Sequence, residues 1–410
     1  MRLRHLALAY FRRFNSFDHE FARGATVIWG DNGAGKSNLI EASYLLATTR
    51  SPYTSSEREL ISWNCPHRPA FARAVGTCDG AHRETTVELR LVEPETQVAE
   101  AFTDDTNDEP YFPSSVRRRA IVDGRARAIG DVLGNVVAVH FSPEGVELVA
   151  GASEGRRRFL DVALAQIDRA YVRGLRRYQR AIVQRNAMLR RLRDEPSLAS
   201  SLLDPWDAEA STSGAIVVAC RLRAIGRLNA ALATLDESAP GGAAIRMGYA
   251  PSVALRHVDS PEGPYIRGWD DADPVISAIR QSMDDAFRAT RTRDRAAATT
   301  LIGPHRDDFT VFAGGVDQRT HGSRGQQRTA ALALRVAESH FMTEVVGESP
   351  VLLFDDVMSE LDPSRRAFVE SLAITADQAI VTGTEASMFS AKFGASSAAF
   401  RLQNGRLTPA

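Results

Sequence analysis

A glycine-rich segment near the beginning of the chain has the residue types and spacing of a phosphate-binding loop. Residues 30–37 fit the pattern G-x-x-x-x-G-K-[ST]. In such a loop, backbone N–H groups and the N-terminus of the following helix bind phosphate, the lysine reaches the β- and γ-phosphates, and the hydroxyl ligates Mg²⁺. We therefore expect a bound nucleotide to contact Gly30, Asp31, Asn32, Gly33, Ala34, Gly35, Lys36, Ser37 and Asn38.

The segments on either side of this loop are those that a phosphate-binding loop requires. Residues 25–29 are apolar and partly β-branched, which predicts a buried strand. Residues 38–46 carry apolar side chains at helical spacing. Lys36 and Lys392 are the only lysines among 50 basic residues, and a compact ammonium suits this loop better than a planar guanidinium. A chance glycine-rich turn is therefore the weaker interpretation.

A pair of acidic residues follows a second apolar run. Residues 351–354 predict a buried strand, and Asp355 and Asp356 come directly after it. Such a strand brings a carboxylate to the cation held by Ser37. We expect Asp355 to hold the metal, directly or through water, and Asp356 to orient or deprotonate the attacking water, with Lys36 as the other catalytic residue. The alternative for the acidic pair alone is an ordinary solvated turn.

The composition is that of a globular protein with one large or two ordinary domains. The chain has 410 residues, of which 44% are hydrophobic and 25% charged, and a net charge of −1. Any affinity for nucleic acid must therefore come from local patches. The longest apolar run is too short to cross a membrane, and the N-terminus lacks signal-peptide features. The three cysteines have no metal-binding spacing, and three is a poor count for a disulfide framework. A cytoplasmic protein with no membrane partner is therefore expected.

The middle of the chain predicts a helical domain. From Leu160 to Leu192 apolar residues recur mostly at three- and four-residue steps, which indicates a long amphipathic helix. Its expected partners are residues 208–236 and 274–290, joined by a loop-rich connection, residues 239–273, with room for a strand. Residues 93–110 are acidic and are expected to form a solvated loop without chemistry.

The other face of this helical segment is rich in arginine. Residues 156–193 contain twelve arginines and two aspartates. Arginines that neutralise phosphates release counterions, so this face is a candidate DNA surface. The alternatives are that the face packs against acidic parts of the nucleotide-binding head, or that it is merely solvated. The candidate DNA-binding residues are Arg173, Arg176, Arg177 and Arg180.

A glycine- and glutamine-containing segment precedes the acidic pair by about thirty residues. Ser323, Gly325 and Gln326 lie at the expected start of a helix, and Ser359-Glu360-Leu361-Asp362 follows the acidic pair. This order resembles the ABC-type ATPases. The resemblance implies that two heads dimerise head to tail, with Ser323, Gly325 and Gln326 capping the γ-phosphate bound by the other copy. A helix capped by Ser323 is the alternative for this segment alone.

Three classes of ABC-type protein share this order of motifs. Lys36 and Ser323 are 287 residues apart, which is much more than in a transporter subunit and much less than in a chromosome organiser with long heptad arms. The chain is similar to the RecF family, and the matching motifs run in order along nearly the whole sequence: residues 33–42, 156–161, 303–308, 322–327 and 355–362.

The resemblance implies a fold and a function. The expected fold is α/β: a discontinuous P-loop ABC-type ATPase head, residues 1–150 and 301–410, with a mainly helical domain inserted at 151–300. The expected cofactors are ATP and Mg²⁺, and the expected assembly is an ATP-dependent homodimer. As in the family, it would clamp single-stranded and gapped or linear duplex DNA, work with RecO and RecR to load recombinase, and serve DNA replication, repair and the SOS response.

The same resemblance implies an ATPase that DNA stimulates. Its turnover is expected to be weak, because Asp356 has a shorter side chain than the glutamate that transporter-type ATPases usually have at this position. The competing functions are another ABC-type DNA ATPase that gates a separate nuclease and, more distantly, a transporter ATPase subunit.

Overall fold

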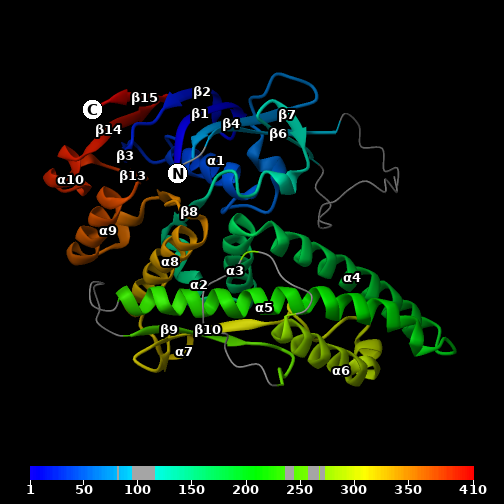
Figure 1. Ribbon diagram of the computed structural model, residues 1–410. Helices are drawn as coiled ribbons and strands as arrows, with labels where there is room; N and C mark the ends of the chain where they lie inside the picture. The colour runs from blue at the N-terminus through cyan, green and yellow to red at the C-terminus, as the bar shows by residue number, and fades with distance from the viewer. Residues whose placement is uncertain (81–82, 95–115, 236–243, 257–266, 268–272) are drawn as a thin grey trace. The chain divides into compact units, whose positions relative to one another are not determined.

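The computed structural model describes residues 1–80, 83–94, 116–235, 244–256, 267 and 273–410 (Figure 1). They form two compact units. The first joins residues 1–145 to residues 338–410, and the second comprises residues 146–337. Most of the acidic segment expected as a solvated loop, from residue 95 onward, lies outside the described residues.

The first unit contains a mainly parallel sheet. Its strand order is β15-β14-β3-β13-β12-β8, with bounds Arg406–Pro409, Ser397–Gln403, Gly24–Trp29, Gln378–Gly383, Val351–Phe354 and Ala138–Phe141. The neighbouring strands β3, β13 and β12 run parallel to one another and are almost wholly buried. Burial on both faces explains why they are continuous apolar runs rather than alternating ones.

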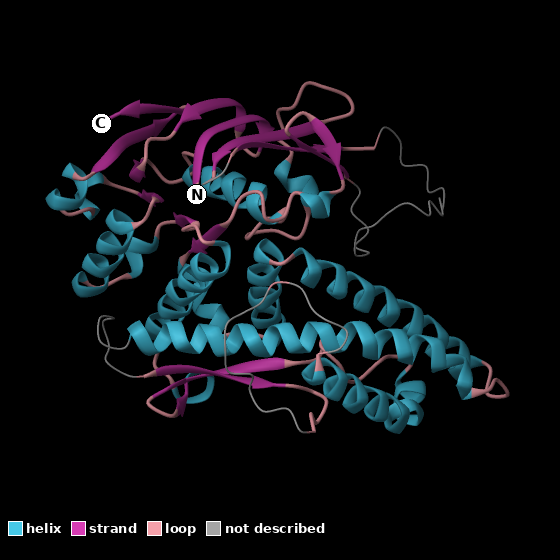
Figure 2. Cartoon of the chain, in the orientation of Figure 1, coloured by secondary structure: helices cyan, strands magenta, loops and turns pink. Residues whose placement is uncertain are grey.

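An antiparallel sheet completes the first unit (Figure 2). Its order is β2-β1-β4-β5-β6-β7, with bounds Phe14–Glu20, Arg2–Phe11, Phe71–Asp79, Glu84–Val92, Arg117–Val122 and Arg125–Arg127. Helix α1 (Lys36–Thr48) contacts strands of both sheets, and most of its residues are buried. The remaining helices of this unit are α9 (Pro363–Thr375) and α10 (Ala391–Ala395).

The second unit is built on helices around a small sheet. The sheet has the order β11-β10-β9, with bounds Val316–Asp317, Asp308–Ala313 and Ile245–Ala250. The helices are α2 (Glu147–Ala150), α3 (Ser153–Ile167), α4 (Arg169–Asp194), α5 (Asp204–Leu235), α6 (Pro274–Ala297) and α7 (Gln318–His321); α8 (Arg324–Val346) starts here and continues into the first unit. None of the helices in the described part of the chain is long and apolar enough to cross a membrane.

The long helix expected from Leu160 to Leu192 is interrupted. Asp168 has extended backbone and accepts hydrogen bonds from the N–H groups of Ala170 and Tyr171, so it ends α3 and caps α4. The apolar spacing continues across the break, which is why periodicity alone predicted one helix. The expected partners are confirmed, because α4 packs on α5 and α6.

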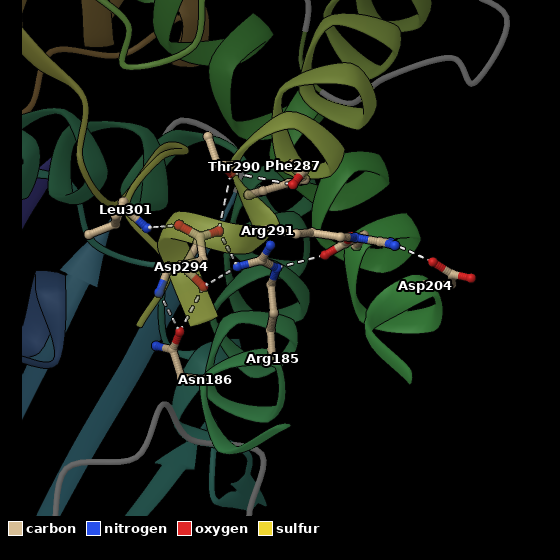
Figure 3. Close-up of polar contacts among 10 residues, drawn as sticks. Arg185, Asn186, Asp204, Phe287, Thr290, Arg291, Asp294 and Leu301 are labelled. Carbon is tan, nitrogen blue, oxygen red and sulfur yellow. Dashed lines mark hydrogen bonds and ion pairs between the residues drawn. The ribbon is translucent and has the colours of Figure 1, made fainter. Parts of the chain in front are cut away.

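The arginines of this segment do not all lie on one solvated face. Arg156 is 2% exposed and pairs with Asp308. Arg185 is fully buried, and its guanidinium donates to Asp207 at 2.7 Å and to Asp294 at 2.8 Å (Figure 3). It also lies 4.9 Å from the centre of the Phe287 ring. These two arginines therefore pack against acidic groups, and those groups belong to the second unit itself rather than to the first.

The second unit extends beyond the expected boundary at residue 300. Strand β10 pairs along its whole length with β9, from Asp308 opposite Ala250 to Ala313 opposite Ile245. This pairing holds residues 308–313 in the same unit as the helices, and the compact unit ends at Ala337. A local pattern indicates a strand but not the sheet that it joins, so the sequence could not place this boundary.

The turn before β10 is fixed by a half-buried histidine. His305 Nε2 lies 3.2 Å from the Thr300 carbonyl oxygen, which can only accept, so Nε2 carries the proton. Nδ1 then accepts from the Tyr178 hydroxyl at 2.6 Å. A Cβ at Gly303 would lie 2.3 Å from that hydroxyl, so only glycine fits there. Burial lowers the pKa of His305 to about 4.

This histidine gives a pH prediction. Below pH 6.5 the histidine of the unfolded chain binds a proton, whereas His305 in the folded protein stays neutral down to about pH 4. The contribution of His305 to the free energy of unfolding is therefore fully present at neutral pH and is lost as the pH falls from 6.5 toward about 4. Between pH 7.5 and 5 the loss from this group is about 2 kcal/mol. Urea unfolding at both pH values measures it, with His305→Gln as comparison. An equal loss in the variant would contradict the prediction.

Candidate nucleotide-binding site

The phosphate loop connects β3 to α1, as its pattern requires. Gly35 immediately precedes α1 with φ of 109°, and a Cβ there would lie 3.0 Å from the side chains of Arg13 and Phe14. A Cβ at Gly30 would lie 2.5 Å from the Leu402 carbonyl oxygen. Both positions therefore need glycine. The resulting loop exposes Asp31, Asn32, Gly33 and Ser37, while Ala34 and Asn38 are half-buried.

Lys36 is the buried cation of this loop. It is 7% exposed, and its ammonium donates to the carbonyl oxygens of Gly30 at 2.7 Å and Asp31 at 3.1 Å. Burial lowers the pKa of Lys36, and the charges of Asp356 and Asp355 oppose this effect. The lysine ammonium therefore contacts the phosphate loop and interacts with the charges of two carboxylates.

Strand order brings Asp355 to Ser37. Strand β3 leads into the phosphate loop, β12 leads into Asp355, and β13 lies between them. Because the carboxyl ends of parallel strands share one edge of a sheet, the three segments meet there. The Ser37 hydroxyl donates to Asp355 Oδ1 at 3.1 Å, and the hydroxyl of Thr382, near the end of β13, donates to the same oxygen at 2.8 Å.

Asp356 differs from its neighbour in its surroundings. Its backbone has φ of 50°, in the left-handed region that is uncommon for a residue with a side chain. Its N–H donates to Thr382 Oγ1 at 3.0 Å. Within the described residues, its Oδ1 is buried and has no hydrogen-bond partner. Burial and the charge of Asp355 raise the pKa of Asp356, a trend that favours a base over a permanently charged group.

The donor set fits a cation of the magnesium type. A serine hydroxyl and a carboxylate, from segments 318 positions apart, meet in one hydrogen bond. Both are hard oxygen donors, which Mg²⁺ prefers, with water and phosphate oxygens completing its shell. The unpartnered Asp356 oxygen adds a further acceptor beside them. Ser37 and Asp355 are thus suitable ligands.

Comparison with known proteins identifies the family. The model of the RecF/RecN/SMC N terminal domain matches residues 2–406. The chain is 37% identical to the DNA replication and repair protein RecF of Chloroflexus aurantiacus over 413 residues, 99% of each chain. It is also 37% identical to RecF of Roseiflexus castenholzii over 422 residues, all of both chains. The chain belongs to the RecF family of DNA replication and repair proteins.

Solved structures of RecF share the fold. Two structures of the recombination mediator protein RecF in the RecFOR pathway, one with ATP and one with ATPrS, match this chain with a TM-score of 0.81. Their identities are 27% and 26%, and each match covers the whole of this chain. The expected ATPase-head fold and the RecF resemblance are confirmed. Among the described residues, nothing favours a transporter subunit or a nuclease-gating ATPase instead.

The segment expected to act in trans begins α8 in the second unit. Ser323 Oγ accepts from the Gln326 N–H at 3.3 Å, and Gln326 Oε1 accepts from the Ser323 N–H at 2.8 Å. This reciprocal pair is a capping box. Ser323 and Gln326 are exposed, and Gly325 is half-buried without a side chain over the helix end. In this RecF-family chain, the segment is therefore a capped helix N-terminus that faces solvent.

The candidate DNA-binding arginines lie on α4. Arg173, Arg177 and Arg180 are exposed, and Arg176 is half-buried. Arg177 makes two hydrogen bonds to Glu209, at 2.9 and 3.2 Å, so part of its charge is already balanced. Arg173, Arg176 and Arg180 are spaced by three and four residues, which places them on one side of the helix.

Three residues of the nucleotide site were not predicted. The hydroxyl of Tyr53 donates to Asp355 Oδ2 and lies 3.0 Å from His140 Nε2, while Thr382 contacts Asp355 Oδ1. Thr382 had a usable signal, since a polar residue near the end of a buried parallel strand faces the same edge as Asp355. His140 sits inside an apolar strand, and Tyr53 lies in an irregular loop, where spacing carries no information.

Proposed function

We propose that this chain is an ATP-dependent DNA clamp of the RecF type, which binds ATP with Mg²⁺, dimerises on DNA and opens after hydrolysis. The observation that carries the proposal is the meeting of Lys36, Ser37, Asp355 and Asp356 at one edge of one sheet. This set unites a phosphate-binding cation, two cation ligands and a carboxylate of raised pKa. Phosphoryl transfer to water needs these groups together.

Each residue of the set has a distinct role. Ser37 and Asp355 would hold Mg²⁺, which would supply positive charge to the bound phosphates. Lys36 binds the same phosphates as a buried ammonium. Asp356 orients the attacking water and accepts its proton through the buried oxygen that has no other partner in the described residues. The short side chain of Asp356 makes hydrolysis slow. The ATPase therefore acts as a switch, and DNA stimulates it.

The second half of the site comes from another copy of the chain. Ser323, Gly325 and Gln326 lie at the N-terminus of α8, where the helix dipole and the N–H groups of the first turn favour phosphate. We place this end against the γ-phosphate of a partner subunit. ATP then joins the two copies, and its hydrolysis separates them. The capping box supports the proposal because it keeps the first turn of α8 formed before the phosphate arrives.

The proposed DNA surface includes three arginines of α4. Arg173, Arg176 and Arg180 are guanidinium groups on one side of the helix and neutralise DNA phosphates there. The substrates are single-stranded DNA and gapped or linear duplex DNA. The relatives are named as DNA replication and repair proteins, and the solved structures as part of the RecFOR pathway. These names support a role in DNA repair together with RecO and RecR. The proposed role is cytoplasmic and includes recombinase loading and SOS induction.

Charge reversal on α4 tests the DNA surface. Arg173→Glu/Arg176→Glu/Arg180→Glu is expected to weaken binding to gapped duplex DNA by about 10-fold or more and to reduce the slope of log K against log salt by about 2–3. Fluorescence anisotropy at several salt concentrations, with ATP and Mg²⁺ present, measures both. The matched control reverses the exposed Arg280, Arg288 and Arg293 of α6. If log K falls with log salt equally steeply in the α4 variant and the unchanged protein, the DNA surface lies elsewhere.

A further inference from the structure

Tyr53 makes polar contacts at the nucleotide site although it belongs to none of the sequence motifs. The residue is 39% exposed, yet its hydroxyl contacts two buried side chains. It donates to Asp355 Oδ2, and it lies 3.0 Å from Nε2 of the buried His140. A partly exposed aromatic residue whose hydroxyl has two buried partners is held by those partners rather than by packing alone.

The loop that carries Tyr53 is tied to the phosphate-loop helix. The Ser51 hydroxyl accepts from the N–H groups of Tyr53 at 3.0 Å and Thr54 at 3.1 Å, and it donates to Glu41 at 2.5 Å. Glu41 belongs to α1 and is 1% exposed. It also receives two hydrogen bonds from Arg12, at 2.8 and 2.7 Å. Tyr53 is therefore fixed with respect to the helix that begins at Lys36.

The second partner, His140, fixes Tyr53 from the sheet. His140 lies in β8, where its backbone is paired with Leu353 of β12, two residues before Asp355. Its ring meets the Tyr53 ring edge-on, with centres 5.5 Å apart and an angle of 83° between the planes. The Tyr44 ring of α1 lies on it as well, with centres 5.4 Å apart. The phenol thus has one rigid support on α1 and another on the sheet.

These contacts determine the orientation of the Asp355 carboxylate. Ser37 and Thr382 donate to Oδ1, and Tyr53 donates to Oδ2. A carboxylate held through only one oxygen can still turn about its last bond, whereas donors on both oxygens stop that rotation. Tyr53 is the donor in its contact with Asp355, because a carboxylate oxygen accepts hydrogen bonds.

We propose that Tyr53 is a positioning residue that holds Asp355 in the orientation for Mg²⁺ at the nucleotide site, with His140 and the Ser51–Glu41 contact holding Tyr53 in turn. The inference rests on the proposed function, because it concerns the same metal ligand. Residues that hydrogen-bond to a metal ligand typically contribute about 10- to 100-fold to metal affinity. Tyr53 makes such a contact through a hydroxyl that phenylalanine lacks.

Removal of that hydroxyl is the test. Tyr53→Phe keeps the ring and is expected to raise the Mg²⁺ concentration needed for half-maximal binding of a fluorescent ATP analogue by about 10-fold. Binding of the same analogue in EDTA should stay as in the unchanged protein. Mn²⁺ titration followed by electron paramagnetic resonance should show the same weakening without any turnover. Tyr10→Phe is the matched control, since its hydroxyl bonds to His67.

A second variant guards against a loss of folding. Ser51→Ala leaves the phenol in place but removes the hydroxyl that connects the loop to Glu41, and it should shift the Mg²⁺ midpoint in the same direction. Unchanged midpoints in both variants, or equal losses with Mg²⁺ and with EDTA, would overturn the positioning role. An unchanged protein that binds no nucleotide would instead overturn the proposed function. Thermal unfolding of each variant accompanies the titrations.

Discussion

Replacement of Lys36 by alanine is expected to lower the affinity for ATP by about 100-fold, which corresponds to about 2.7 kcal/mol, and to abolish ATP-induced dimerisation. Lys36 is buried, and its ammonium is already held at the loop by the carbonyl oxygens of Gly30 and Asp31. A charge in such a position interacts with phosphate more strongly than an exposed one does, because water screens it less. Its removal also takes away a cation that interacts with the charges of Asp356 and Asp355.

The chain supplies a matched control for this substitution. Lys392 is the only other lysine; it is exposed on α10, so Lys392→Ala makes the same chemical change away from the phosphate loop. Titration calorimetry measures the affinity, and light scattering measures the dimer. A Lys36→Ala protein that still dimerises with ATP would show that the composite site does not depend on this phosphate contact, and the account would fail there.

Asp356→Asn is expected to separate binding from hydrolysis. The amide has the same shape but cannot accept a proton from water, and general bases typically contribute about 10²- to 10⁴-fold to rates. Hydrolysis should therefore fall by at least about 100-fold, while ATP affinity is retained. Because hydrolysis opens the proposed clamp, the ATP-bound dimer should persist. The raised pKa of Asp356 and its buried, unpartnered oxygen in the described site support this role.

Single-turnover hydrolysis and dimer lifetime together measure this effect. Glu360→Gln is the control, since it neutralises an exposed carboxylate in the same segment. Normal turnover in Asp356→Asn with a normal dimer lifetime would assign the catalytic base to another residue. A loss of ATP binding would place Asp356 among the binding residues instead.

The sequence predicted those parts of the site whose signals are local. A phosphate loop is specified by glycines, a lysine and a serine within eight positions, and its strand and helix lie next to it. Asp355 could be predicted because a buried apolar run gives a parallel strand, and parallel strands present their carboxyl ends at one edge. The fold class followed from the same alternation of strands and helices.

The parts that were missed depend on contacts between distant segments. The charge pattern of residues 156–193 did not reveal that Arg185 is buried, because its partners Asp207 and Asp294 come from two other helices. Tyr53 lies in a loop without periodicity, and it matters only because folding brings it to Asp355, 302 positions away. The break at Asp168 is local, but a continuous apolar spacing on both sides concealed it.

Sedimentation velocity of the unchanged protein tests the central claim most directly. The protein would be compared with ATP and Mg²⁺, with ADP and Mg²⁺, and without nucleotide, each with and without gapped duplex DNA. The composite site, in which Ser323 and its neighbours close on a phosphate held by Lys36 of the partner subunit, predicts a dimer with ATP alone, and that dimer should sediment with the DNA. A monomer under all conditions would contradict it.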